Sequence, residues 1–231
     1  MKNIGIILAG GSGSRVGAKI AKQFITIEGK TILEHTIEKF VYHPLIDELA
    51  VVISEKEYEN AKYIISRNNY SKKILLTIGG EMRYHSTLAA LKLYTNERCN
   101  ILIHDAARPL VTHRIITDVI TALKDFHAVN VAIPATDTII ETDHTHNYIE
   151  RIPNRHQVFL VQTPQGFDSQ TLENAYKTAL SDPEFITTDD CSVVKRYLPE
   201  EKIKIVEGDT SNIKLTYAED IAWFEHMLKN N

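Results

Sequence analysis

A chain of 231 residues with 43% hydrophobic residues can bury one large core, and its length allows one or two domains. The net charge of −4 argues against a general nucleic-acid-binding protein, which would carry a basic stripe, and favours a small anionic substrate. No apolar run approaches the roughly 20 residues of a membrane span, and the start of the chain lacks a signal-peptide pattern. Cys99 and Cys191 match no zinc spacing, so we expect both to be reduced in a cytoplasmic protein.

The first predicted strand, residues 4–9, leads directly into a glycine-rich loop. Gly10, Gly11 and Gly13 occur there together with Ser12 and Ser14. Glycine lets the backbone approach a ligand closely, and consecutive N–H groups in such a loop form a concavity that favours anions. The loop therefore predicts a seat for the phosphates of a nucleotide.

Cations follow this loop within a few residues, at Arg15, Lys19 and Lys22. The loop matches neither of two better-known phosphate motifs, because Val16 replaces the third glycine of the dinucleotide fingerprint and Gly17 is not followed by the lysine of a P-loop. A tight turn with a solvated basic rim is the structural alternative.

The rest of the chain alternates short β-type runs with helical spacing. Strands are predicted at residues 49–53, 74–78, 101–103, 129–133, 158–161 and 203–206, and helices at residues 32–42, 58–66, 83–93, 115–126, 172–180 and 219–228. This alternation indicates βαβ units and a mostly parallel sheet, in which ligands bind beyond the carboxyl ends of the strands. Residues 11–15, 80–83 and 105–108 each follow a strand, so we expect them to meet at one edge.

One segment breaks the alternation and reads as a β-hairpin. Its two β-branched runs, residues 138–142 and 148–152, flank a polar turn at residues 143–147. A hairpin with few large apolar residues is only marginally stable alone, so we expect it to pack against another surface, such as a second subunit. The chain is thus predicted to be one domain, residues 1–231, with an arm at residues 136–157.

Two downstream segments carry residues suited to phosphate chemistry. Asp105, just past a strand end, is a suitable Mg²⁺ ligand, and Arg108 is suited to a phosphate, although an internal Asp–Arg ion pair is the alternative. Lys214 would reach the same phosphates or remain solvated. The hydroxyl of Thr163, in an X-Pro turn after a strand, is a further candidate phosphate contact.

Several polar residues favour a structural interpretation. Asp189 and Asp190 are better explained as the N-cap and first-turn acid of a short helix at residues 191–197. The ten histidines show no metal spacing and, apart from His104, are interpreted as surface or packing residues. Ser86 has no evident histidine–acid partner for a hydrolase triad.

The ordered motifs LAGGSGSRVG, KQF, GGEMRYHS, HDAARP, DT, NR, QTPQ, TDDCS and NIK resemble those of the IspD/TarI-type cytidylyltransferases. That family includes 2-C-methyl-D-erythritol 4-phosphate (MEP) and D-ribitol-5-phosphate cytidylyltransferases. The resemblance implies a Rossmann-like nucleotidyltransferase fold with a mostly parallel central sheet and a protruding β-hairpin arm that joins a homodimer. It also implies the reaction CTP + polyol phosphate → CDP-polyol + pyrophosphate, with Mg²⁺ and with neither nucleic acid nor membrane as a partner.

The resemblance also assigns residues by motif position. Arg15, Lys22 and Lys214 would stabilise charge on the α-phosphorus, and Asp105 would hold the metal. The acceptor would be held by Arg108 and Thr163, with Thr138 and Arg155 coming from the arm of the partner subunit. CTP would be bound by Ala9, Gly10, Gly11, Ser12, Gly13, Ser14, Gly80, Glu81 and Ser86.

The sequence departs from the family pattern at three positions. Ala21 stands where many relatives have proline, Cys191 replaces an alanine, and Ser211 replaces an acidic residue for which Asp209 is the nearest substitute. LAGG and the segment THRII resemble the ribitol-phosphate group, whereas HDAARP and TDDCS resemble the MEP group. We expect D-ribitol 5-phosphate as the acceptor, with MEP as the alternative. A sugar-1-phosphate nucleotidyltransferase and a non-catalytic nucleotide-binding regulator remain open.

Overall fold

The structure, a computed structural model, describes residues 1–11, 21–95, 97–217 and 219–229. Four residues predicted to bind nucleotide or to act in catalysis, Ser12, Gly13, Ser14 and Arg15, lie outside the described residues.

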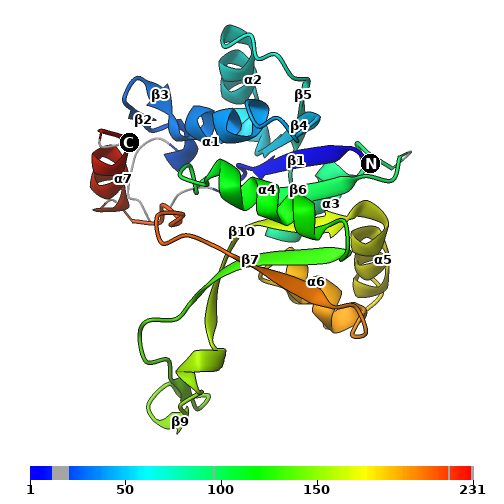
Figure 1. Cartoon of the computed structure of the whole chain (residues 1–231), viewed down its shortest axis with the longest axis vertical. Coiled ribbons are helices and arrows are strands. Elements are labelled where there is room, and N and C mark those ends of the chain that lie inside the picture. Colours follow the sequence, from blue (N-terminus) through cyan, green and yellow to red (C-terminus); the bar gives the residue numbers. More distant parts are fainter. Residues whose placement is uncertain (12–20, 96, 218, 230–231) are drawn as a thin grey trace.

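One seven-stranded sheet organises the described chain, with the strand order β11-β7-β10-β6-β1-β4-β5 (Figure 1). Neighbouring strands are parallel except around β10, which runs antiparallel to both β6 and β7. The prediction of an α/β fold with a mostly parallel central sheet is therefore confirmed. The strands are β1 (Asn3–Leu8), β4 (Glu48–Ile53), β5 (Ile74–Ile78), β6 (Asn100–Asp105), β7 (Ala128–Pro134), β10 (Phe159–Asp168) and β11 (Ile203–Glu207).

Strand β10 is longer than the sequence predicted. The strand begins at Phe159, one residue later than predicted, and runs for ten residues, so that Thr163 and Pro164 lie inside it rather than in a turn after it. The register with β7 shifts between Gln162 and Gln165, which leaves Thr163 and Pro164 out of the ladder. Proline lacks the N–H that a ladder needs, so an irregularity of this kind is where a strand accommodates it.

Helices cover both faces of the sheet because successive strand side chains point to opposite faces. Ile7 packs in the core with α1 (Ile32–Val41), α2 (Tyr58–Arg67) and α4 (His113–Ala122). Ile4 and Ile6 pack on the other face with α3 (Arg83–Leu91), α5 (Ser169–Ala179) and α6 (Asp190–Tyr197). This two-sided burial explains the continuous apolar runs of the central strands.

A third apolar cluster joins a small hairpin to the last helix. The hairpin β2 (Thr26–Ile27) and β3 (Lys30–Thr31) packs with α7 (Glu219–Lys229) through Ile27, Leu215 and Phe224. Short 3₁₀ turns occupy Lys22–Phe24, Glu55–Glu57 and Arg155–Gln157. In the described part of the chain, no helix combines the length and apolar content of a membrane span.

The predicted hairpin extends away from the sheet as an arm (Figure 1). Its strands β8 (Glu141–Thr142) and β9 (Ile149–Arg151) pair antiparallel and are shorter than predicted. Tyr148, Ile149 and Ile152 are 74%, 58% and 59% exposed. The arm therefore presents apolar surface to solvent, which a further surface would have to cover. The assignment of residues 1–231 to one domain with a dimerisation arm stays a prediction.

The start of α1 is fixed by an ion pair that bears on acid stability. Thr31 and Glu34 form a reciprocal capping box, and Glu34 also accepts hydrogen bonds from Arg67 and Asn68. Although burial alone would raise the pKa of Glu34, these hydrogen bonds lower it to about 2.

Candidate active site

A cavity of about 280 Å³ lies where β1 and β6 end, beside the loop that follows β5. Every described residue predicted to bind CTP, hold metal or stabilise the transferred phosphate lines it. These residues are Ala9, Gly10, Gly11, Lys22, Gly80, Glu81, Ser86, Asp105 and Lys214. The expectation that residues following separate strands meet at one edge of the sheet is thus met for Gly11, residues 80–83 and Asp105, whereas residues 12–15 lie outside the described chain and Arg108 does not line the cavity.

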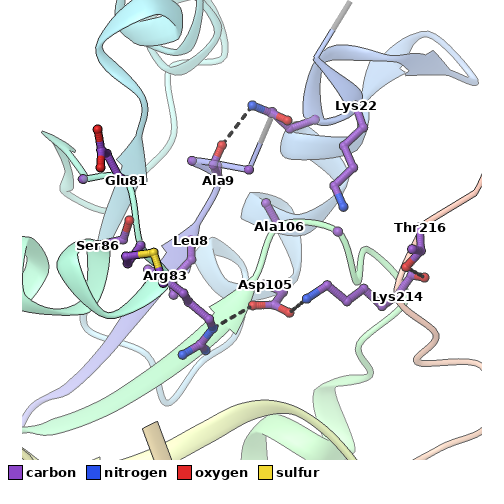
Figure 2. Close-up of a pocket in the computed structure, with 16 residues that line it drawn as sticks. Leu8, Ala9, Lys22, Glu81, Arg83, Ser86, Asp105, Ala106, Lys214 and Thr216 are labelled. Carbon is purple, nitrogen blue, oxygen red and sulfur yellow. Dashed lines mark hydrogen bonds and ion pairs between the residues drawn. The ribbon is translucent and has the colours of Figure 1, made fainter. Parts of the chain in front are cut away.

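Backbone contacts fix the wall that follows β1. The N–H of Ala9 donates to the carbonyl of Val52 at 2.7 Å, and its carbonyl accepts from Gln23 Nε2 at 2.9 Å (Figure 2). Because Gln23 is only 3% exposed, this bond ties the chain after the glycine loop to the end of β1. Gly10 and Gly11 are held at the rim of the cavity as a result.

Two glycines let the first turn of α3 approach the opposite wall. A Cβ added at Gly79 would lie 2.3 Å from Ser86 Oγ, and one added at Gly80 would lie 2.6 Å from His85 Cβ. Real side chains do not make such contacts, so the segment requires glycine at both positions. From the sequence, Gly80 was predicted to bind CTP, whereas Gly79 had no predicted role in the site.

Asp105 stands between two cations at the end of β6. Lys214 Nζ lies 2.7 Å from Asp105 Oδ2, and Arg83 Nε lies 3.7 Å from Asp105 Oδ1 (Figure 2). Burial alone would raise the pKa of Asp105, but the charges of Lys214 and Arg83 hold it well below its usual range. The carboxylate is therefore ionised at neutral pH and ready to interact with a cation.

The second predicted lysine, Lys22, reaches the same region. Its Nζ donates to the carbonyl of Leu215 at 3.0 Å, next along the chain from Lys214. Lys22 follows the glycine loop, whereas Lys214 follows the last strand, so the fold brings together ammonium groups from opposite ends of the chain (Figure 2). Such a pair can stabilise several phosphate oxygens at once.

Family comparison agrees with this arrangement. Residues 4–230 match the family model described as IspD, 2-C-methyl-D-erythritol 4-phosphate cytidylyltransferase. The chain is 40% identical, over 96% of its length and 92% of the relative's, to a protein of Thermobifida fusca named 2-C-methyl-D-erythritol 4-phosphate cytidylyltransferase.

A bifunctional relative and a solved structure extend the comparison. The chain is 44% identical over 95% of its length to the Haemophilus influenzae protein named ribulose 5-phosphate reductase/CDP-ribitol pyrophosphorylase, of which it spans 47%. It is also similar, with a TM-score of 0.87 and 31% identity, to the crystal structure of 4-diphosphocytidyl-2C-methyl-D-erythritol synthase from Anaerococcus prevotii. That match covers 99% of this chain and 96% of the other.

The chain belongs to the IspD family. It is an enzyme of the nucleotidyltransferase class, as the family resemblance in the sequence implied, and it has the IspD nucleotidyltransferase fold.

The four residues that the IspD resemblance assigns to the acceptor do not line the cavity. Thr163 is buried, and its hydroxyl lies 3.1 Å from the backbone N of Asp105 and 3.0 Å from Nδ1 of His104. Thr138 and Arg155 are exposed on the arm, where Arg155 donates to the carbonyl of Thr136 at 3.3 Å. One chain alone therefore does not bring these groups into the cavity.

Arg108, the fourth acceptor residue, is bound to backbone rather than to Asp105. Its guanidinium donates to the carbonyls of Asn212 at 2.6 Å and Val161 at 3.3 Å. Within the described chain its buried Nε has no hydrogen-bond partner, and burial lowers the pKa of Arg108. The alternative of an Asp105–Arg108 ion pair is wrong, because Arg83 and Lys214 are the cations paired with Asp105.

His104 is a packing residue. It is fully buried, and its Nε2 lies 3.0 Å from the carbonyl of Arg108. Burial lowers the pKa of His104 to about 4, so the ring is neutral at neutral pH. Both of its nitrogens have partners, which leaves it a structural tie between β6 and β10.

The interpretation of Asp189 as a helix cap is confirmed, and the next residue, Asp190, also forms an ion pair. Asp189 accepts from the N–H of Ser192 at 2.8 Å. Asp190 pairs with Arg83, a residue that lines the cavity and was not assigned a role from the sequence. The motif GGEMRYHS contained the signal, since it places an arginine between two segments predicted to bind nucleotide.

The residues around Asp105 fit a magnesium ion that is shared with substrate. Within the described ranges, no group of three acidic, histidine or cysteine residues is placed to hold a metal. Mg²⁺ is commonly held by one or two carboxylates together with substrate phosphates, an arrangement that the ionised Asp105 in this cavity fits. Asp209 does not line this cavity, and its carboxylate accepts hydrogen bonds from the N–H and the hydroxyl of Ser211.

Proposed function

We propose that this enzyme transfers the cytidylyl group of CTP to a polyol phosphate, releasing pyrophosphate and forming a CDP-polyol. The observation that carries the proposal is the convergence of Gly10, Gly80, Asp105, Lys22 and Lys214 on one cavity in a chain of the IspD family. Three further predicted CTP-binding residues, Ser12, Gly13 and Ser14, and the predicted catalytic residue Arg15 are included by their place in the motif.

The proposed cytidylyl transfer requires positioning of the two substrates and stabilisation of negative charge rather than a general base. A phosphate oxygen of the acceptor attacks the α-phosphorus of CTP, and the bond from that phosphorus to the bridging oxygen of the β-phosphate breaks. Phosphate monoesters have a second pKa near 6, so the attacking group is already ionised at neutral pH. Holding two anions together in a fixed orientation supplies most of the rate. The absence of a need for a general base agrees with the state of His104, which is neutral and already hydrogen-bonded to Thr163.

Two walls of the cavity would bind the nucleotide. Gly10 and Gly11 would contact the phosphates, while Gly80, Glu81 and Ser86 would bind the cytosine on the opposite wall. Lys22 and Lys214, with Arg15, would stabilise the charge that develops on the α-phosphate and on the leaving pyrophosphate. Asp105 would hold Mg²⁺, which supplies further neutralisation of phosphate charge when bound.

For the acceptor, MEP is better supported than the D-ribitol 5-phosphate expected from the sequence. The family model and the Thermobifida fusca relative are both described as MEP cytidylyltransferases. Ribitol 5-phosphate is the second candidate, because the bifunctional relative named as a CDP-ribitol pyrophosphorylase is 44% identical over 95% of this chain. The acceptor would also determine how the product is used: a product made from MEP would serve isoprenoid precursor synthesis, and CDP-ribitol would serve cell-wall polymers.

The acceptor residues on the arm suggest that two copies of the chain complete each site. Thr138 and Arg155 are exposed, and the arm carries the exposed apolar residues Tyr148, Ile149 and Ile152. Pairing of two arms would cover this surface and would deliver Thr138 and Arg155 of the partner subunit to the acceptor. Homodimerisation, like the cytoplasmic location, is part of the proposal.

The deciding experiment measures pyrophosphate release from CTP with MEP and with D-ribitol 5-phosphate in separate reactions. We expect turnover with MEP to exceed turnover with ribitol 5-phosphate in kcat/KM. The reverse order would make ribitol 5-phosphate the substrate. CTP binding without turnover on either acceptor would favour a nucleotide-binding regulator. Release from UTP or dTTP with sugar 1-phosphates instead would indicate the sugar-nucleotide class.

A further inference from the structure

Asp190 is a buried charge that lies outside the cavity yet is linked to it. Its side chain is fully buried, with Oδ2 2.5 Å from Arg83 Nη1 and Oδ1 2.6 Å from the hydroxyl of Tyr176. An ionised carboxylate in such a position is costly unless it is paired and hydrogen-bonded. The described residues that line the cavity include Arg83 but neither Asp190 nor Tyr176.

Arg83 connects this buried charge to the site. One end of its guanidinium contacts Asp190, and its Nε faces Asp105 at 3.7 Å (Figure 2 shows the latter contact). Asp105 also pairs with Lys214 at 2.7 Å. The four groups therefore form a continuous row, Asp190–Arg83–Asp105–Lys214, in which two carboxylates balance two cations.

The ion pair between Asp190 and Arg83 is not needed to stabilise the start of α6. The first N–H groups of that helix already have partners, because Gln165 Oε1 accepts from the backbone N of Asp190 at 3.1 Å and of Cys191 at 3.2 Å. Asp189 caps the same turn through Ser192. The Asp190 carboxylate is therefore not used to cap the helix, and it pairs with Arg83 instead.

We propose that Asp190 is a positioning residue that keeps Asp105 available to a divalent cation by holding the far end of the Arg83 guanidinium. The inference rests on the proposed function and adds a residue that determines metal affinity. Without the Asp190 charge, Arg83 would be free to close onto Asp105 and compete with the ion for its oxygens. The row would also gain one net positive charge, which repels a cation. Both effects weaken metal binding.

The test is the affinity of the enzyme–CTP complex for Mn²⁺, measured by electron paramagnetic resonance of the free ion with no acceptor present. Asp190→Asn keeps the shape of the side chain and an acceptor for Tyr176. We expect it to weaken Mn²⁺ binding about 10-fold to 100-fold, as is typical for loss of partners that orient a metal ligand. Tyr176→Phe leaves the carboxylate in place and should give a smaller shift, which keeps the inference testable if Asp190→Asn does not fold.

Two further variants separate this role from general damage. Asp168→Asn removes another buried carboxylate that pairs with an arginine, Arg98, at the opposite end of β6, and should leave Mn²⁺ affinity unchanged. The double variant Arg83→Met, Asp190→Asn removes the competing guanidinium together with its holder. Its Mn²⁺ affinity should return toward that of the unaltered enzyme.

Three results would overturn the inference. Mn²⁺ affinity of Asp190→Asn could equal that of the unaltered enzyme, or the double variant could be as weak as Asp190→Asn. Metal-free CTP binding could also fall as much as Mn²⁺ binding, which would mean that Asp190 supports the cavity as a whole. Failure of the unaltered enzyme to bind Mn²⁺ with CTP is a separate result, and it would refute the proposed metal site and this inference together.

Discussion

Replacing Lys214 by methionine should separate catalysis from stability. Its Nζ pairs with Asp105 at 2.7 Å, but the lysine side chain is 41% exposed. Ion pairs between exposed groups contribute about 0–1 kcal/mol to stability, whereas leaving a buried charge without any partner costs about 3–5 kcal/mol. For a chain of this size, 1 kcal/mol corresponds to roughly 2–4 °C in Tm. Because Arg83 still faces Asp105, Lys214→Met should lower Tm by no more than that.

The same substitution should have a large effect on turnover. Loss of one charge-stabilising donor at a developing oxyanion commonly costs about 10²–10³ in kcat, or about 3–4 kcal/mol. The assay is steady-state pyrophosphate release, with the Tm of each variant measured alongside it. Lys73→Met is the matched control, since Lys73 pairs with Glu48 at 3.4 Å and does not line the cavity. A turnover number for Lys214→Met equal to that of Lys73→Met would refute the assignment of Lys214 to catalysis.

Three other predictions test the fold around the site. Gly79→Ala would put a Cβ 2.3 Å from Ser86 Oγ, so we expect a loss of about 1–3 kcal/mol in thermal unfolding and a higher KM for CTP; an unchanged KM would contradict the role of this wall. The pKa of Glu34 is about 2 in the folded chain against 4.5 ordinarily, so its stabilisation of about 3 kcal/mol is present above pH 4.5 and is lost as pH falls toward 2. Glu34→Gln should flatten the acid-unfolding curve over that range, and an unchanged slope would argue against the pairing. Tyr148→Glu with Ile149→Glu should convert a dimer to monomers in sedimentation velocity, whereas dimers that persist would place the interface elsewhere.

Much of the fold follows from simple patterns in the sequence. The apolar runs at residues 4–9 and 49–53 are strands buried on both faces, which is why they show continuous rather than alternating hydrophobicity. The direction of β10 was not predictable in this way, because burial pattern carries no information on strand polarity. Pro164 favoured the prediction of a turn after the strand, whereas the structure accommodates this proline inside β10 at the register shift between Gln162 and Gln165.

The site was predictable where a residue lies at the carboxyl end of a strand or within a few residues after it. Asp105 and the glycines at positions 10, 11 and 80 met that condition, and they line the cavity. The link between Arg83 and Asp190 was not predictable, because the two are 107 positions apart and join different helices. The capping interpretation accounted for Asp189 but gave no reason for the next side chain to point inward. That orientation depends on the packing of α6 against α5, which brings Tyr176 beside Asp190.

The most direct test of the account is a crystal structure of the enzyme with CTP bound. The account predicts the triphosphate beside Gly10 and Gly11 with Lys22 and Lys214 in contact with its oxygens, and the cytosine against Gly80 and Ser86. A nucleotide bound outside this cavity, or one bound within it with both lysines turned away from the phosphates, would contradict it.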